Sequence, residues 1–126
     1  MAGHCCFSGA ELGCAKLGFS HDDLGDGMPI YMTARFKVRA DALQQCDEAI
    51  REFVGYVELN EPRTRLYTSV QEAGDPTRFL HFFVFDDEAA QEAHANSMAV
   101  KRFTDILYPA CEAPVEFTEY SLVATT

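Results

Sequence analysis

Segments with strand periodicity and intervening segments with helix periodicity predict an α+β fold of order βαββαβ for this chain of 126 residues. Three observations predict it. Apolar and polar residues alternate early in the patterned region, apolar residues then recur every three or four positions, and a polar turn later separates two stretches rich in aromatic and β-branched residues. Together they indicate a four-stranded antiparallel sheet covered by helices.

The first strand and the first helix follow each other directly in the chain. Residues 30–38 alternate between apolar and polar side chains, which is typical of a strand with one buried face. Residues 42–59 are expected to form a helix because apolar positions recur there at helical spacing, with Asp41 as a candidate cap. These apolar positions are Leu43, Cys46, Ile50, Phe53, Val54 and Val57.

The second and third strands are predicted to form a hairpin. The sequence Asn-Glu-Pro at residues 60–62 ends the first helix, and residues 65–71 then have strand character. A turn at residues 73–76 leads into residues 78–85, which are almost continuously apolar. Such a run suits a central strand that is buried on both faces.

A second helical region follows, and a last strand closes the chain. Asp86 and Asp87 are candidate caps, and Glu88 stands in the first turn, where a negative charge is favourable. A further helical stretch runs to Pro109, and residues 115–123 form the closing strand. One side of the second helix is expected to carry Ala90, Ala93, His94 and Ser97.

This order of elements is that of a ferredoxin-like βαββαβ plait, in which helices cover only one face of a four-stranded antiparallel sheet. The other face then has to be buried elsewhere. Pairing two sheets across a two-fold axis is the simplest way to bury it, so we expect a homodimer.

Composition separates an N-terminal extension from the folded region. Six of the eight glycines and three of the five cysteines precede Met28, and the apolar residues there have no sustained period. We therefore expect residues 1–27 to be a Gly/Cys-rich extension and residues 28–126 to be the folded domain.

Charge and hydropathy argue against two classes of partner. The formal net charge is −10, and so acidic a chain repels a phosphate backbone, which disfavours nucleic-acid binding. No run approaches the roughly 18 apolar residues of a membrane helix. No secretory signal is visible at the start of the sequence, so we expect a cytoplasmic protein.

The five cysteines favour reduced thiols over a disulfide framework. Cys46 lies on the apolar helix stripe and Cys111 follows a helix-ending proline, so both are expected to be small buried hydrophobic residues. The extension also offers ligands that suit zinc or copper(I), although their spacing follows no recognised zinc pattern. These ligands are His4, Cys5, Cys6, Cys14 and His21.

Several short motifs in the patterned region occur in an order that recurs in a known protein family. A Glu-Pro turn at residues 61–62 precedes a strand with Tyr67, and an aromatic strand then covers residues 79–85. The sequence DEAA at residues 87–90 follows, with His94 four residues beyond it. In this order and spacing, almost the whole patterned region resembles the antibiotic biosynthesis monooxygenase (ABM) family.

The resemblance implies a dimeric α+β barrel with a small apolar cavity in each subunit, between sheet and helices. Members of the family include cofactor-free oxygenases of polycyclic aromatic quinols, haem-degrading enzymes, and an isomerase of a small phosphorylated signal molecule. The haem-degrading branch uses a Trp to distort its porphyrin, and this chain has no Trp, which disfavours that activity. Phe85, Phe83 and Arg63 stand where the family often has Trp, an acidic residue and Gly.

His94 matches the helix histidine of the family and is the candidate catalytic residue. An imidazole titrates near neutral pH, and it suits the removal or return of a phenol proton in an apolar pocket. The alternative role is a structural histidine that bonds a backbone carbonyl at the helix edge.

His81 is expected on the same strand face as Phe79, Phe83 and Phe85, since side chains alternate along a strand. A polar ring among aromatic side chains suits a group that orients a substrate. The alternative is a histidine whose hydrogen bonds are satisfied in the core or at the dimer interface.

Further residues are candidates for substrate binding. Tyr67 and Tyr31 offer a phenol hydrogen bond to a quinone-like oxygen, and Asn60 offers an amide at the end of the first helix. Phenylalanine side chains suit the wall of an aromatic pocket and are also what an ordinary core contains. Those expected around the cavity are Phe83, Phe85, Phe36 and Phe103.

The first functional hypothesis is a cofactor-independent monooxygenase that acts on a quinol-like or polycyclic aromatic metabolite. Deprotonation gives an electron-rich phenolate that reacts directly with dioxygen, while the protein binds the substrate, stabilises its anion and excludes water. The alternative hypothesis is a non-catalytic dimeric module that binds a metal or another ligand through the Cys/His residues of its extension.

Overall fold

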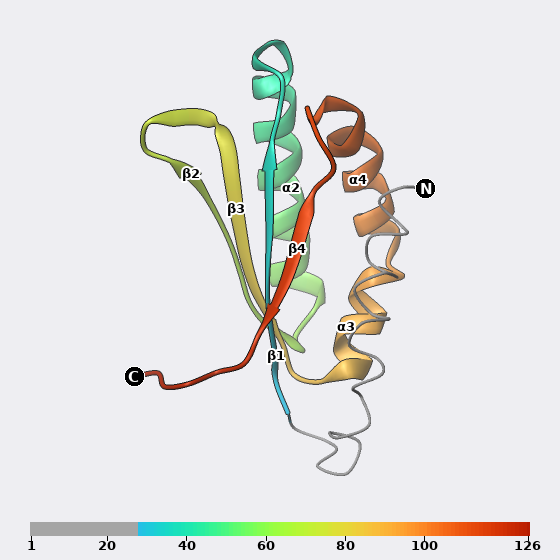
Figure 1. The fold of residues 1–126 in the computed structure, drawn as a ribbon. Helices are drawn as coiled ribbons and strands as arrows, with labels where there is room; N and C mark the ends of the chain where they lie inside the picture. Colours follow the sequence, from blue (N-terminus) through green and yellow to red (C-terminus); the bar gives the residue numbers. More distant parts are fainter. Residues whose placement is uncertain (1–27) are drawn as a thin grey trace.

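The computed structural model describes residues 28–126, which form one four-stranded sheet with helices packed on one of its faces (Figure 1). The sequence predictions for residues 1–27, including the metal ligands of the extension, lie outside the described residues. In chain order the elements are β1 (Ile30–Lys37), the 3₁₀ helix η1 (Ala40–Ala42), α2 (Leu43–Asn60), β2 (Thr64–Glu72), β3 (Asp75–Phe85), α3 (Glu88–Ala95), α4 (Met98–Ala110) and β4 (Glu116–Tyr120).

The sheet has the strand order β2-β3-β1-β4, and every neighbouring pair is antiparallel. β3 and β1 are therefore the two central strands. In the register, Ala34 of β1 lies between His81 of β3 and Phe117 of β4. This arrangement confirms the predicted ferredoxin-like α+β fold.

The first helix begins without the predicted cap. Residues 40–42 form a 3₁₀ turn before α2, so Ala42 takes the N-cap position and no side chain caps it. The carboxylate of Asp41 instead accepts a hydrogen bond from Nε of Arg39 at 3.1 Å. The prediction of Asp41 as the helix cap is therefore wrong.

β3 is central in the sheet, but it is not buried on both faces along its length. Its side chains toward the helices are buried, whereas Leu80 and Phe82, which point the other way, are only half-buried. Val84 is the exception on that side, at 5% exposure. The difference from the prediction follows from the helices covering one face of the sheet alone.

Two polar side chains set the starts of the later helices. Asp87 caps α3, because its carboxylate accepts from the backbone N–H of Ala90 at 2.9 Å, as predicted. Ser97 was expected on the side of the same helix, but it caps the separate helix α4 by accepting from the N–H of Val100. α3 therefore ends before Ser97, and α4 begins as a separate helix.

β4 ends at Tyr120, three residues earlier than expected. Tyr120 pairs with Tyr31, which is the second residue of β1, so β1 offers almost no further backbone to extend the ladder. Leu122 and Val123 lie beyond the strand and are 51% and 95% exposed.

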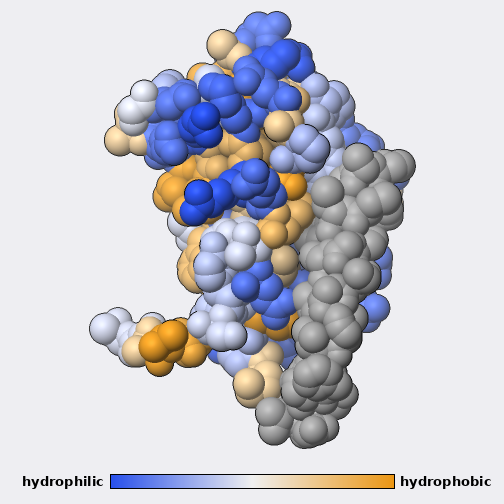
Figure 2. Space-filling model, viewed as in Figure 1, coloured by the Kyte–Doolittle hydropathy of each residue, from blue (hydrophilic) through white to orange (hydrophobic). Residues whose placement is uncertain are grey.

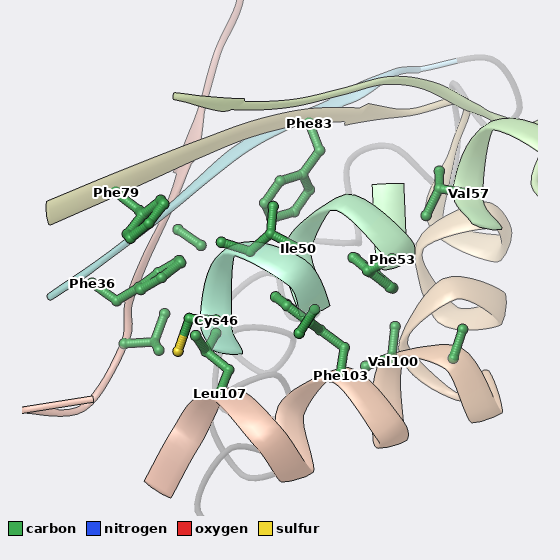
Figure 3. Close-up of a cluster of buried hydrophobic side chains, with 14 of the residues drawn as sticks. Phe36, Cys46, Ile50, Phe53, Val57, Phe79, Phe83, Val100, Phe103 and Leu107 are labelled. Carbon is green, nitrogen blue, oxygen red and sulfur yellow. The ribbon is translucent and has the colours of Figure 1, made fainter. Parts of the chain in front are cut away.

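The core lies between the sheet and the helices and is rich in stacked rings (Figure 3). Phe53 of α2 and Phe103 of α4 stack at a centroid distance of 4.6 Å, and Phe36 stacks on Phe79 at 5.3 Å. Cys46 is fully buried beneath them, which confirms its predicted core role, and burial raises the pKa of its thiol. The first of these ring pairs joins α2 to α4, and the second joins β1 to β3.

The face of the sheet away from the helices is partly apolar. Leu66, Val70 and Tyr120 are 42%, 48% and 44% exposed there, and Val70 pairs with the half-buried Leu80. In the space-filling view, apolar side chains lie in patches between polar ones (Figure 2). None of the helices described between residues 28 and 126 is long and apolar enough to cross a membrane.

Candidate functional site

A small cavity lies between the sheet and the helices, and aromatic side chains form most of its wall. It has a volume of about 30 Å³, and α4 contributes one side of it. Three of its lining residues, Thr104, Tyr108 and Phe117, are half-buried and mark its rim between α4 and β4. The rings that line the interior belong to Phe36, Phe53, Tyr67, His81, Phe83, His94 and Phe103.

His94 enters this cavity from the last turn of α3, and it is paired with a carboxylate. Its Nδ1 lies 2.7 Å from Oε1 of Glu61, and the two side chains are 2% and 13% exposed. Ala90, one turn earlier, is buried on the same side of α3. The short helix therefore directs His94 inward, where water does not compete for the Glu61 contact.

Glu61 is the residue that follows α2, and its neighbours hold it toward His94. Thr64 donates from its hydroxyl to Oε1 of Glu61 at 2.8 Å and from its backbone N–H to the carbonyl of Glu61 at 3.0 Å. Burial, the largest single influence, favours the protonated acid, but the His94 and Thr64 hydrogen bonds and the charge of His94 outweigh it and lower the pKa of Glu61. Glu61 is therefore a carboxylate at neutral pH.

Ion pairs join the turn that carries Glu61 to the start of the helix that carries His94. Arg63 donates to Oδ2 of Asp87 at 2.5 Å, and Arg65 donates to Oδ1 of Asp86 at 2.6 Å. The backbone N–H of Asp86 also donates to the carbonyl of Arg63 at 2.9 Å. These contacts fix the spacing between the two elements from which Glu61 and His94 come.

His81 and Tyr67 form a second polar pair in the cavity wall. Nδ1 of His81 lies 3.0 Å from the hydroxyl of Tyr67. Burial lowers the pKa of His81 to about 4, and burial, followed by the charges of Tyr108 and Glu61, raises the pKa of Tyr67. Both side chains are therefore neutral at physiological pH.

The two pairs have different chemical capacities. His94 has a carboxylate at Nδ1 that stabilises an imidazolium, so the pair suits the transfer of a proton. His81 resists protonation and suits a neutral hydrogen bond instead. Within residues 28–126, no three His, Cys, Asp or Glu side chains are grouped as metal ligands.

The structure brings four of the predicted site residues together around the cavity. They are His94, His81, Tyr67 and Phe83, and the Phe36 and Phe103 rings join them. These are the residues on which a proposal about the site rests.

Three other predicted substrate-binding residues lie elsewhere. Phe85 is fully buried but behind the cavity wall, against the rings of Phe83 and His94. Tyr31 pairs with Tyr120 and stands one position from the inward-facing Met32, so it lies on the open face of the sheet. Asn60 is exposed, and its amide donates to the carbonyl of Tyr56 at 3.1 Å.

Glu61 is the site residue that the sequence analysis did not select. It was read as part of the Glu-Pro turn that ends α2, and the position beside it, Asn60, was expected to reach the cavity. A signal was present, because a carboxylate directly before Pro62 and three residues before Thr64 is placed for the Thr64 contact that is observed. Its pairing with His94, 33 residues away, depends on the tertiary fold.

Several solved structures are similar to this fold. A candidate antibiotic biosynthesis monooxygenase from Caulobacter crescentus has a TM-score of 0.73 at 15% identity, covering 83% of this chain and 99% of that one. A candidate from Nitrosomonas europaea has a TM-score of 0.72 at 21% identity, covering 79% and 95%. Rv0793 of Mycobacterium tuberculosis has a TM-score of 0.71 at 18% identity, covering 78% and 98%. At these identities the likeness concerns the fold.

The sequence itself matches the family model described as antibiotic biosynthesis monooxygenase over residues 29–105. No curated protein matches it. The matched segment includes β1 to α3 and most of α4, so it contains Glu61, Tyr67, His81 and His94. Because this segment is more than half of the chain, the chain belongs to the antibiotic biosynthesis monooxygenase family.

Proposed function

We propose that this protein is a cofactor-independent monooxygenase that oxidises a quinol-like or polycyclic aromatic metabolite in the cavity between its sheet and its helices. The observation that carries the proposal is the buried contact of 2.7 Å between His94 and Glu61, set among aromatic rings. A proton-transfer pair in an apolar, aromatic cavity suits a substrate that is itself aromatic and weakly acidic.

The reaction begins with removal of a substrate proton by His94, whose positive charge Glu61 then stabilises. The resulting phenolate is electron-rich and transfers electrons to dioxygen. One oxygen atom forms a bond to the substrate carbon, and the other leaves as water with the two hydrogens that the substrate loses. The substrate therefore supplies all four electrons that dioxygen accepts. The protein binds the ring, orients it and excludes bulk water.

The cavity has to enlarge to hold such a substrate. Its volume of about 30 Å³ is well below the several hundred Å³ typical of ligand pockets. Tyr108 and Phe117 are half-buried at the rim, so they are the side chains that can turn outward with the least disruption of the core. We infer that the substrate enters between α4 and β4 and replaces these rings against the cavity wall.

We also propose that the protein is a homodimer paired through the open faces of two sheets. Leu66, Val70 and Tyr120 expose apolar surface there, and Leu80 and Phe82 of β3 add half-buried apolar side chains to the same face. A contiguous apolar face of this kind favours association with a second copy. The cavity lies on the opposite side of the sheet, so pairing leaves its rim accessible.

The proposed activity is tested by measuring oxygen consumption with a panel of quinols and anthrones, without added metal or cofactor. The expected result is turnover of at least one member of the panel and its loss in His94→Ala. Glu58→Gln, a change of an exposed residue on α2, is the matched control and should retain full activity. No consumption by the wild type, or equal consumption by His94→Ala, would contradict the proposal.

A further inference from the structure

His81 is a buried polar side chain, and the core of the described residues does not account for its second ring nitrogen, Nε2, because it offers that atom no hydrogen bond. It is 1% exposed and lines the cavity. Its ring is held edge-on against Phe36 at a centroid distance of 5.0 Å and parallel to Phe103 at 6.2 Å. Among the residues that the structure describes, Nε2 of His81 has no hydrogen-bond partner, although a buried polar atom without one is costly.

The contact with Tyr67 determines which nitrogen of His81 carries the proton. If Nδ1 carried it, Nδ1–H would donate to the Tyr67 oxygen, and both the Tyr67 proton and the Nε2 lone pair would lack a partner among the described residues. If Tyr67 instead donates to Nδ1, Nε2–H is the only polar group of this pair that lacks a partner among the described residues. The second arrangement leaves fewer polar groups unsatisfied, so His81 presents an N–H donor at Nε2.

The Tyr67 ring lies beside both this histidine and the histidine of the proton-transfer pair. Its ring centroid is 5.4 Å from that of His81 and 5.8 Å from that of His94. Both histidines line the same cavity. A planar ligand in this cavity is therefore within reach of both histidines.

We propose that His81 is the second polar contact of this site and donates from Nε2 to an acceptor oxygen of the ligand, which restricts the site to aromatic ligands that carry a carbonyl or oxyanion conjugated to the ring. The proposal rests on the proposed function, in which His94 removes the ligand proton. When the C–H or O–H bond breaks, the proton goes to His94 and the electron pair is delocalised onto the oxygen that faces His81. The N–H donor then stabilises the charge that develops there.

Two properties of His81 suit this role. Burial holds its pKa at about 4, so it stays neutral at working pH and keeps its acceptor nitrogen for Tyr67. The packing of Phe36 and Phe103 against its ring fixes its orientation before a ligand arrives, so little reorganisation is required. Tyr67 acts as a positioning residue, since it sets the tautomer.

The first test requires no ligand. Protein labelled with ¹⁵N in its histidines, with His81→Phe used to assign the signals, reports the tautomer from the ¹⁵N shifts of the two ring nitrogens. The proposal predicts that His81 carries its proton on Nε2. A proton on Nδ1 would overturn it, whatever the enzyme's activity.

The second test compares binding of 1-tetralone and tetralin, which have the same fused rings and differ in one carbonyl oxygen. Titration followed by NMR should show 1-tetralone binding about tenfold more tightly to the wild type, the factor expected for one buried hydrogen bond. His81→Phe should abolish the preference, and Tyr67→Phe should reduce it. Thr33→Val is the matched control, because it removes a hydrogen bond to Tyr120 on the other face of the sheet.

Equal affinity of the two compounds for the wild type, no binding of 1-tetralone, or a preference unchanged in His81→Phe would each overturn the proposal. An unchanged preference would mean that Nε2 bonds only a trapped water. Because these readouts measure binding, they are independent of turnover. Loss of oxygen consumption with an intact preference would contradict the proposed function and leave the His81 assignment standing.

Discussion

Oε1 of Glu61 lies 2.7 Å from Nδ1 of His94, so the turn after α2 fixes the orientation of a side chain that comes from α3. Thr64 donates to the same carboxylate oxygen at 2.8 Å and completes the support. Since the carboxylate is bound at Nδ1, a proton exchanged with a ligand passes through Nε2 of His94. The relationship makes Glu61 a positioning residue for the proposed base.

Glu61→Gln should lower turnover by about tenfold or more, because an amide orients His94 without stabilising its positive charge. The pH profile of kcat should also shift, whereas KM should change little. Steady-state oxygen consumption gives kcat and KM at each pH. It is measured between about pH 5 and pH 9, roughly the range in which histidine titrates. A variant with the turnover and pH profile of the wild type would show that Glu61 has only a structural role.

Asp87 has two functions that substitution can separate. Its Oδ1 caps α3 through the N–H of Ala90, and its Oδ2 accepts from Arg63. Asp87→Ala should lower the free energy of unfolding by about 1–2 kcal/mol, the usual cost of losing a cap. Asp87→Asn keeps an oxygen for the cap and should cost less than about 1 kcal/mol, because the Arg63 partner is half-exposed.

Urea denaturation of the two Asp87 variants measures these costs. The ordering of the variants is the informative result. Equal destabilisation by Ala and Asn would mean that the ion pair with Arg63, and not the cap, holds the start of α3.

His81 should make stability depend on pH in a defined window. Burial lowers its pKa in the folded protein from 6.5 to about 4, so the unfolded chain binds the proton first as pH falls. Stability therefore declines from about pH 6.5 to about pH 4, by up to about 3 kcal/mol. Below that window both states are protonated and this contribution no longer changes.

Comparison of wild type with His81→Phe isolates the effect, because Glu61 and Asp75 are present in both proteins. Their pKa values are lowered, so their contributions are lost only at more acidic pH. Unfolding free energies at neutral pH and near pH 4.5 should fall further in the wild type than in the variant. Parallel pH curves would argue against a neutral buried His81.

The open sheet face should control the oligomeric state. Val70→Glu places a charge on the apolar surface beside Leu80, its partner in the β2–β3 register, and should convert the dimer to monomers. Leu59→Glu is the matched control, because Leu59 is 83% exposed on α2, away from the sheet. Sedimentation velocity distinguishes the two species, and a wild-type monomer or a dimeric Val70→Glu would contradict the proposed interface.

The sequence predicted the fold well because each element has a local signature. Alternation along β1, helical spacing from Leu43 to Val57, and the two acidic residues before α3 are all read from neighbouring positions. The errors also have local causes. Nothing near Asp41 distinguishes a 3₁₀ turn from a helix start, and the end of β4 depends on where its partner β1 begins.

The candidate site was less predictable, because it is made by contacts between distant elements. Strand periodicity placed His81 and Phe83 on one inward face, as observed. Periodicity gave no way to choose between Asn60 and Glu61. These residues are neighbours at the end of α2 and point in different directions, so an error of one position in the helix decides which side chain is expected to reach His94. The pairing of Tyr67 with His81 follows from the β2–β3 register, which a bulge between Thr64 and Leu66 shifts.

The most direct test of the central claim is to follow one oxygen atom. The purified protein, freed of metals by chelation, is incubated with an anthrone or quinol substrate under ¹⁸O-labelled dioxygen, and the product is analysed by mass spectrometry. The account predicts a product with one labelled oxygen atom from the wild type and none above background from His94→Ala. Unlabelled product, or labelled product formed equally by both proteins, would contradict a monooxygenase that works through the His94–Glu61 pair.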